Sequence, residues 1–198
     1  MERADLAELH FITPIGNLPS IMKQGIVCNR RSGALGAKSI AKPDVQALRA
    51  KKRVPGGLMI HEYANLYFNA RNPMMYLRSA LHEETCVLSI ACDVLDLEGV
   101  AITDQNAASN WARFAAAPDG IYIVDATMTF AERWTHPGDQ KLEWQHKSAM
   151  CAEVLVPNCI PPQHVRLAYV SSDAVAKKIG QLAPPLKVVL NPRLFFRQ

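Results

Sequence analysis

The order of apolar and polar residues along the chain predicts short strands and helices that alternate irregularly. Short apolar runs rich in β-branched and aromatic residues predict strands, at residues 9–13, 66–68, 85–91, 100–103, 121–124, 152–156, 166–170 and 186–190. Apolar residues at helical spacing, with capping residues or glycine at the ends, predict helices at residues 18–24, 39–53, 106–117 and 173–182, and a helix start at 73–77. Because the regular rhythm of a doubly wound sheet is missing, the pattern predicts an α+β fold with mostly antiparallel pairing.

Two segments between these elements are predicted to be loops. Residues 30–36 indicate a flexible loop, and residues 125–145 indicate an extended one that contains Trp134, His136 and Trp144. Loops as long as the second are uncommon in compact domains and are often functional.

Length and composition describe one soluble globular domain. The chain has 198 residues, enough for one domain with a core, and we predict a single domain over residues 1–198. The first residues carry charges and no apolar signal segment, and no run approaches the ~18 apolar residues of a membrane span. Five cysteines without a CxxC pair, and the absence of HExxH, predict reduced thiols, no metal site and a cytoplasmic protein without a membrane anchor.

Positive charge is concentrated in one segment. Residues 20–57 contain nine basic residues and one acid, a net charge of +8, whereas the other residues contain thirteen basic and seventeen acidic ones, a net charge of −4. The nine are Lys23, Arg30, Arg31, Lys38, Lys42, Arg49, Lys51, Lys52 and Arg53. A basic patch of this kind favours a polyanionic partner. A solvated helix face explains the charge run about equally well.

The nucleotide-binding motifs of common folds are absent. The chain has neither GxGxxG nor GxxxxGK[ST], so the Rossmann and P-loop interpretations are excluded, and Gly56-Gly57 fits a turn. Residues 61–74 combine His, Tyr, Phe, Asn and Arg71 in a way that suits stacking on nucleobases or on a nicotinamide ring. A strand of half-buried aromatic residues followed by a polar turn explains the same composition and is favoured by composition alone.

Glu153 is the residue whose position most needs an explanation. It stands within KSAMCAEVLVP, residues 147–157, where the chain turns into an apolar strand. Burial of an unpaired carboxylate would cost several kcal/mol or more, so Glu153 lies at the solvent end of the strand or has a partner and a task. A lone carboxylate is suited to stabilising the oxocarbenium-like transition state of glycosidic-bond cleavage. His10 and Cys151 are interpreted as packed core residues.

Five blocks of the sequence together resemble one known family. HFITPIGNLPSIMKQGI, SIAKPDVQALRAKKRVPGG, MIHEYANLYFNARNPM, AITDQNAASNWARF and AMCAEVLVP are similar, in order and spacing, to DarT-type DNA ADP-ribosyltransferase toxins, over about Leu9 to Val170. The resemblance implies transfer of ADP-ribose from NAD+, a consumed substrate rather than a redox cofactor, to a base of single-stranded DNA. It also implies a core of two small, mostly antiparallel sheets that form an NAD+ cleft flanked by helices, and a macrodomain antitoxin of the DarG type.

The resemblance also implies site residues. Glu153 and Arg49 would be catalytic and would meet over the bound dinucleotide, assisting proton loss from the acceptor base. Contacts to NAD+ would come from His10, Phe11, Ile12, Thr13, Ser20 and Arg49, and contacts to nucleic acid from Lys51, Lys52, Arg53 and Arg71. His10 is offset by one from the family's histidine, which corresponds to Phe11, and strand neighbours point to opposite faces. Family members differ between thymine and guanine, so both acceptor bases stay open.

Two other functions remain possible at this stage. The same Glu153 would serve a transferase that modifies RNA or a protein side chain. A catalytically inactive nucleic-acid-binding module would keep the basic segment and use no NAD+, although the presence of both Arg49 and Glu153 argues against it.

Overall fold

The computed structural model describes all residues, 1–198, and its main feature is one eight-stranded sheet. The strand order is β10-β9-β4-β1-β3-β7-β5-β6, and β2 and β8 form a separate two-stranded sheet. The strands are β1 (Leu9–Pro14), β2 (Ile26–Val27), β3 (Tyr63–Tyr67), β4 (Thr85–Ile90), β5 (Ala101–Thr103), β6 (Phe114–Ala116), β7 (Glu153–Pro157), β8 (Cys159–Ile160), β9 (Val165–Val170) and β10 (Val188–Leu190). Only β9 and β10 pair in parallel, so the expectation of mostly antiparallel pairing is confirmed.

The expectation of two small sheets is wrong for the main sheet, which is continuous across eight strands. Its two halves nevertheless meet at a single register position, because β1 and β3 pair only where His10 lies opposite Tyr67. By contrast, β1 pairs with β4 at six positions. The apolar pattern marks strands but carries no information on which strands are neighbours, so it could not show that the halves are joined. Beyond His10 the two strands separate.

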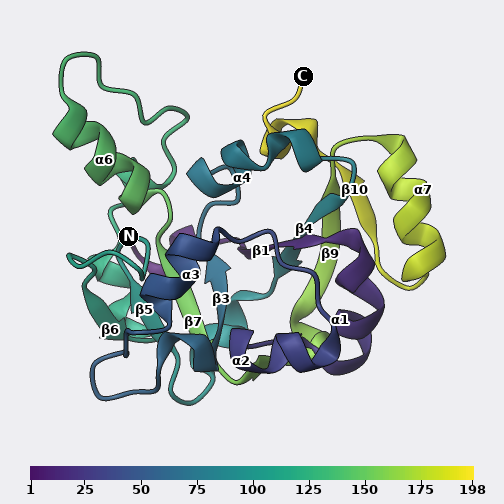
Figure 1. Ribbon diagram of the computed structural model, residues 1–198, viewed down its shortest axis with the longest axis horizontal. Helices are drawn as coiled ribbons and strands as arrows, with labels where there is room; N and C mark the ends of the chain where they lie inside the picture. Colours follow the sequence, from purple (N-terminus) through teal and green to yellow (C-terminus); the bar gives the residue numbers. More distant parts are fainter.

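Seven α-helices surround the sheet. They are α1 (Leu18–Gln24), α2 (Asn29–Ser32), α3 (Pro43–Arg49), α4 (Pro73–Leu77), α5 (Ala126–Thr129), α6 (Gln140–Ala149) and α7 (Asp173–Leu182). Figure 1 shows α7 at the β10 edge, α3 in front of the middle of the sheet, and α6 extending away from the body at the upper left. No helix combines the length and the apolar character that a membrane crossing requires.

Local sequence explains where several helices begin and end. Proline occupies the first turn of α1, α3 and α4, where its missing N–H costs nothing. Gly25, which ends α1, has a φ of 84°, and a Cβ there would lie 2.2 Å from the carbonyl oxygen of Ile160. Ser172 accepts a hydrogen bond from the backbone N–H of Val175, so α7 begins where the sequence predicts.

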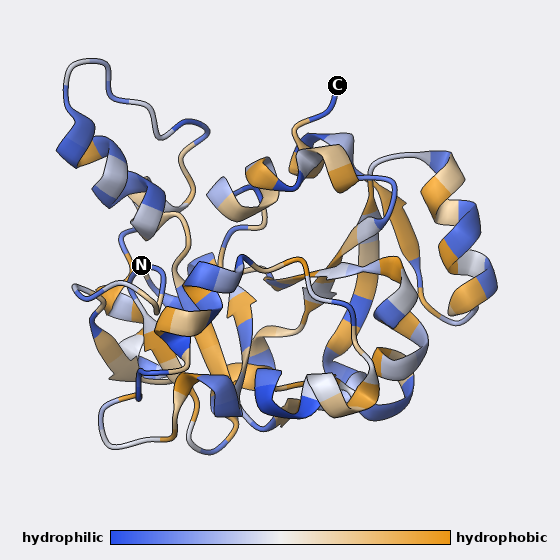
Figure 2. Ribbon diagram, in the orientation of Figure 1, coloured by the Kyte–Doolittle hydropathy of each residue, from blue (hydrophilic) through white to orange (hydrophobic).

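The two faces of the sheet differ in chemistry. One face carries Leu66, Val154 and Ile102 into the largest core cluster, and all three are fully buried. Figure 2 shows β7 as largely hydrophobic and α6 as mostly hydrophilic. Because side chains alternate along a strand, the residues next to these three point to the other face. There Tyr67 lies opposite Glu153, and Glu153 lies opposite Thr103, in a row across β3, β7 and β5.

Two predicted elements are wrong. Residues 106–117 form turns followed by β6 instead of a helix. Asp104 accepts hydrogen bonds from both the backbone and the side chain of Arg113, which closes a loop, and Trp111 is 85% exposed, so its spacing from Phe114 marks no buried helix face. Residues 121–124 are predicted as a strand, but the 3-10 helix Asp119–Ile123 contains the first three of them and Val124 caps its end.

The two predicted loops contain helices. Residues 125–145 contain α5 and the first part of α6. The residues that precede these helices are Asp125 and Asp139, and the side chain of each accepts a hydrogen bond from a backbone N–H of the first turn. Residues 30–36 contain most of α2 and the 3-10 helix Gly33–Leu35. Both segments are poor in apolar residues at helical spacing, which is the signal on which the prediction of a helix depends.

Candidate active site

A cavity of about 500 Å³ opens where β1 and β3 separate. Its walls come from β1, α1, the segment 37–42, α3, β3, α4 and α6. Cavities of this size accommodate ligands of drug or cofactor size. The weak pairing of β1 with β3 therefore leaves room for the NAD+ cleft that the family resemblance implies.

Most residues predicted to contact a dinucleotide line this cavity. The lining includes Phe11, Ile12, Thr13, Ser20 and Arg49. Both Phe11 and its strand neighbours reach the cavity because the cavity lies at the edge that β1 exposes after it leaves β3, and not on one face of the sheet. These five residues, from three elements, are thus brought together as the sequence predicts.

His10 is the exception, because it is not among the residues that line the cavity. At His10 the two strands are still paired, so the cavity begins one residue later. Its ring is held instead by the carbonyl oxygen of Phe68, 3.2 Å from Nδ1, and by the carboxylate of Glu8, 3.2 Å from Nε2. The interpretation of His10 as a core histidine with satisfied ring nitrogens agrees with these contacts.

The carboxylate of Glu8 has three partners and gives a testable pH dependence. Burial alone would raise its pKa, but hydrogen bonds from His10, Ser89 and Tyr169 outweigh burial and lower the pKa from 4.5 to about 2. Because the pKa is lower in the folded chain than in the unfolded chain, ionised Glu8 stabilises the fold fully above pH 4.5, and this contribution is lost as the pH falls toward 2.

We therefore expect Glu8→Gln to lower the free energy of unfolding at pH 7 by about 1–3 kcal/mol, less than the full pKa difference would give, because solvent screens this partly exposed carboxylate. The difference between the wild type and the variant should shrink steadily between pH 4.5 and pH 2. Urea denaturation at pH 7, 4 and 3 measures it. A difference that stays constant over this range would show that the carboxylate charge contributes nothing.

Glu153 and Arg49 form the charged centre of the site. The guanidinium of Arg49 donates two hydrogen bonds to the carboxylate of Glu153, Nη1 to Oε1 at 2.8 Å and Nη2 to Oε2 at 3.0 Å. The side chain of Glu153 is fully buried and that of Arg49 is 7% exposed. Such bidentate pairing is the geometry in which a buried carboxylate is best compensated. The partner that the sequence requires for Glu153 is therefore Arg49.

The surroundings of this pair hold both charges in place. The backbone N–H of Ala107 donates to Oε1 of Glu153 at 3.0 Å, and the backbone N–H of Glu153 donates to the hydroxyl of Thr103. Burial alone would lower the pKa of Arg49, but the charge and hydrogen bonds of Glu153 outweigh it and raise the pKa. Arg49 remains a cation and faces the cavity, while Glu153 lies directly behind it.

Tyr67 and Cys151 complete the wall beside this pair, and both are neutral. Tyr67 lines the cavity next to Glu153; burial and the charge of Glu153 raise the pKa of its phenol well above its ordinary value. The same two causes raise the pKa of the Cys151 thiol to about 12, which agrees with its interpretation as a packed thiol. The sequence indicated Tyr67 only as part of an aromatic cluster, because its role depends on strand register.

The segment 37–42 covers one side of the cavity and is held by two residues that the sequence did not indicate. The amide of Asn17 donates to the carbonyl of Lys38 at 2.8 Å and accepts from the N–H of Lys38 at 3.0 Å. Nε of Arg78 donates to the carbonyl of Ile40 at 2.6 Å. No spacing rule predicts such contacts, since each joins a side chain to a backbone group more than twenty residues away.

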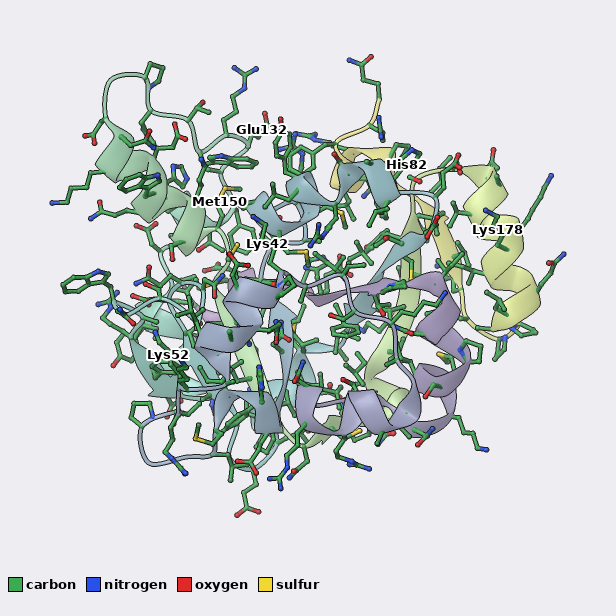
Figure 3. All side chains as sticks on the ribbon, in the orientation of Figure 1. Lys42, Lys52, His82, Glu132, Met150 and Lys178 are labelled. Carbon is green, nitrogen blue, oxygen red and sulfur yellow. The ribbon has the colours of Figure 1, made fainter.

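The four residues predicted to bind nucleic acid do not form one surface. Lys51 is exposed, whereas Nζ of Lys52 donates to the carbonyl of Ala108 at 2.6 Å and Arg53 donates to the carbonyl of Gly57 at 2.8 Å. Figure 3 shows Lys52 beside the β5–β6 end of the molecule. Arg71 lies elsewhere, where it donates to two backbone carbonyls, those of Glu132 and Arg193.

Lys52 has a contact within the chain that the basic run did not predict. Its partner Ala108 follows Ala107, whose N–H binds Glu153, so Lys52 fastens the loop that holds the carboxylate. Partial burial lowers the pKa of Lys52. The amine is positioned for the loop and is not a free surface cation.

Comparisons with known proteins agree with this geometry. Residues 10–196 match the model of a family described as "ssDNA thymidine ADP-ribosyltransferase, DarT". A DNA ADP-ribosyl transferase–DNA ADP-ribosyl glycohydrolase fusion protein of Thermosipho africanus (strain H17ap60334) is 26% identical over 197 residues, which cover 96% of this chain and 49% of the fusion protein. The chain thus spans about half the length of that relative.

Two solved structures share the fold. The structure of Thermus sp. 2.9 DarT in complex with ADP-ribosylated ssDNA has a TM-score of 0.84 at 20% identity and covers 98% of each chain. The structure of Thermus sp. 2.9 DarT in complex with NAD+ has a TM-score of 0.78 at 19% identity and covers 96% of this chain and 98% of the other. At this level of identity the similarity establishes the architecture.

Proposed function

Because its residues 10–196 match the family model, this chain belongs to the ssDNA thymidine ADP-ribosyltransferase family, DarT, and we propose that it transfers ADP-ribose from NAD+ to thymine in single-stranded DNA. The family resemblance expected from the sequence is confirmed. The observation that carries the proposal is the buried ion pair of Arg49 and Glu153 at the wall of a cavity of about 500 Å³. A nucleic-acid-binding module without catalysis has no need for such a pair.

In this proposal NAD+ is a substrate that occupies the cavity between β1 and β3. Phe11, Ile12, Thr13 and Ser20 contact the dinucleotide on the β1–α1 side, and the segment 37–42 covers it. Arg49 is the only member of the ion pair that faces the cavity, so its guanidinium meets the negatively charged or hydroxyl-bearing part of the substrate. The sheet supplies a rigid wall because its strands are fixed on the other face by the core.

The reaction exchanges one glycosidic bond for another. The bond between the ribose carbon and the nicotinamide nitrogen breaks, nicotinamide leaves as a neutral molecule, and a ring nitrogen of thymine forms the new bond to the ribose carbon and loses its proton. The oxocarbenium-like transition state is positive, so the carboxylate of Glu153 stabilises it. We assign Glu153 as the proton acceptor, since an arginine side chain does not give up its own proton in proteins.

Direct pairing of Glu153 with Arg49 has a consequence for this scheme. Both carboxylate oxygens are occupied by Arg49, and one of them also by Ala107. To accept a proton, Glu153 has to exchange one of these hydrogen bonds for one to the base. The substrate provides compensation, because it presents new partners to the guanidinium as it binds.

Mass spectrometry of short oligonucleotides tests the proposal. The enzyme and NAD+ are incubated with a single-stranded oligonucleotide that contains one thymidine, with its matched version in which deoxycytidine replaces thymidine, and with RNA of the same sequence. We expect the mass of one ADP-ribose on the thymidine oligonucleotide only, with release of an equal amount of nicotinamide. If the modification is found only on guanine, on RNA or on a protein, thymine in single-stranded DNA is not the acceptor.

We also propose that a glycohydrolase of the macrodomain type reverses the modification and limits the toxicity of this chain. The support is the Thermosipho relative, a transferase–glycohydrolase fusion protein of which this chain corresponds to about half. Growth arrest on expression of the wild type, absent for Glu153→Gln and relieved by co-expression of such a glycohydrolase, is the expected result.

A further inference from the structure

Three segments that are far apart in the sequence bring aromatic rings together above the cavity. Tyr76 of α4, Trp134 of the loop before α6 and Phe196 near the C-terminus contact one another edge to face, with ring centroids 5.6 Å (Tyr76 to Trp134), 5.2 Å (Tyr76 to Phe196) and 6.0 Å (Trp134 to Phe196) apart. Tyr76 is 54% exposed. The three rings therefore form a cluster at the surface, with ring area left uncovered, rather than part of the core.

Arginines surround this cluster. The guanidinium carbon of Arg71 lies 4.2 Å from the ring centroid of Phe196, a cation–π contact, and Arg71 is fixed by the carbonyls of Glu132 and Arg193. Arg133 and Arg193 are exposed. Partial burial lowers the pKa of Arg71, and the nearby positive charges of Arg193 and Arg133 lower it further, so the three cations repel one another.

Acidic residues neutralise this charge only in part. Glu132 pairs with Arg193, whereas its contact to Arg71 is through its backbone carbonyl. We call Arg71, Tyr76, Arg133, Trp134, Arg193 and Phe196 the arginine–aromatic patch. Arg71 and Arg133 have no carboxylate partner, whereas Arg193 has Glu132. A net positive, aromatic surface complements a polyanion that carries planar rings.

The segments that carry Tyr76 and Trp134 lead directly to residues that line the cavity. Tyr76 belongs to α4, whose Met74 and Leu77 line the cavity. Trp134 lies in the loop that leads into α6, whose Trp144 and Lys147 also line it, and β7 with Glu153 follows α6. Figure 3 shows Glu132 at the upper edge of the molecule, between the α6 loop and the C-terminal segment.

We propose that the arginine–aromatic patch binds the unpaired nucleotides next to the reactive base, with bases stacked on Tyr76 and Trp134 and phosphates near Arg71, Arg133 and Arg193. This inference rests on the proposed function and adds the place where the rest of the single strand is held. Stacking on aromatic rings with flanking cations is how proteins bind single strands without strong sequence preference. With the reactive base in the cavity and the adjacent nucleotides on the patch, the single-stranded DNA would run across α4 in a fixed direction.

The patch also has an evident structural contribution, because Phe196 and Arg71 help to dock the C-terminal segment. Phe196 adopts a left-handed backbone conformation, with a φ of 58°, which is uncommon for a residue other than glycine. Arg133 is exposed, and Tyr76, although it contacts the ring of Phe196, is 54% exposed. They are accordingly the positions at which nucleotide binding can be tested with the least effect on the fold.

The test is binding of a fluorescent single-stranded oligonucleotide of about ten nucleotides, a length within the range of known single-strand sites. It is measured by anisotropy without NAD+, so it does not depend on the reaction. We expect Tyr76→Ala and Trp134→Ala each to raise the dissociation constant about tenfold. Arg133→Ala should raise it less and should reduce its dependence on salt concentration. Tyr122→Ala and Arg166→Ala, exposed residues of the same types outside the patch, should leave it unchanged.

Two results would overturn the proposal. If Tyr76→Ala and Trp134→Ala lower the melting temperature but leave the dissociation constant unchanged, the patch only docks the C-terminal segment. If they weaken binding of duplex DNA as much as that of the single strand, stacking on unpaired bases has no part in it. Because binding is measured without turnover, failure of the transfer reaction would appear separately, as loss of the product in mass spectrometry.

Discussion

Replacement of Glu153 by glutamine should reduce the rate of ADP-ribosyl transfer by a factor of about 10³. Glutamine has nearly the same size and its amide oxygen can still accept from Arg49 or from the backbone of Ala107, so the wall of the cavity keeps its shape. What is lost is the negative charge that stabilises a positive transition state and the group that accepts the proton of the base. Neither loss can be compensated by a neighbour, because Tyr67 and Cys151, beside it, are both neutral.

Single-turnover rates with saturating NAD+ and oligonucleotide measure this effect, with thermal unfolding as the control for folding. Glu98→Gln, which alters an exposed carboxylate elsewhere, is the matched variant and should react like the wild type. A Glu153→Gln enzyme that is folded and retains more than a tenth of the wild-type rate would remove Glu153 from the chemistry. In that case the buried pair would have a structural role alone.

The sequence predicted the elements whose signals are local. The helix Asp173–Leu182 was predicted with its correct ends because Ser172 supplies a cap and Val175 and Ile179 supply a buried face. Strand β4 was predicted to within one residue because every position in it is buried and apolar or small. Alternation and capping act over a few residues, and a single sequence contains both.

Features that depend on neighbours distant in sequence could not be predicted in the same way. Glu153 and Arg49 are 104 positions apart, and the residues alone left open whether Glu153 lies at the solvent end of its strand or has a partner. The family resemblance supplied Arg49. The row of Tyr67, Glu153 and Thr103 depends on the register of three strands, which no local pattern encodes.

The positions of other predicted site residues depend on distant neighbours in the same way. The family resemblance implies that His10 contacts NAD+, but only the pairing of His10 with Tyr67 shows that the cavity begins one residue later. The resemblance implies a nucleic-acid contact for Lys52, and the structure shows that its amine donates to the carbonyl of Ala108. A charge run shows how many cations are present, and contacts from remote loops decide which of them are available.

Replacement of Arg49 by alanine should have the largest effect on stability of any change in the site. It leaves the carboxylate of Glu153 buried with one backbone N–H as its remaining donor, and removal of one partner of a buried ion pair costs about 3–5 kcal/mol. Transfer should also become too slow to detect, because the cation that faces the substrate is gone. Urea denaturation at pH 7 measures the first effect, and single-turnover assays of the folded fraction measure the second.

The two effects of Arg49 separate in the double variant Arg49→Ala/Glu153→Gln. With no charge left in the pocket, most of the stability lost in Arg49→Ala should return, since the loss comes from an unpaired charge and not from missing contacts. Activity should not return, because both catalytic groups are absent. Arg3→Ala, which breaks the exposed bidentate pair with Asp96, should change stability very little, because water and salt screen a surface pair. Two results would contradict this explanation: Arg49→Ala and Arg3→Ala lower the free energy of unfolding equally little, or the double variant is no more stable than Arg49→Ala. In either case the two buried charges of Arg49 and Glu153 do not stabilise the site by compensating each other.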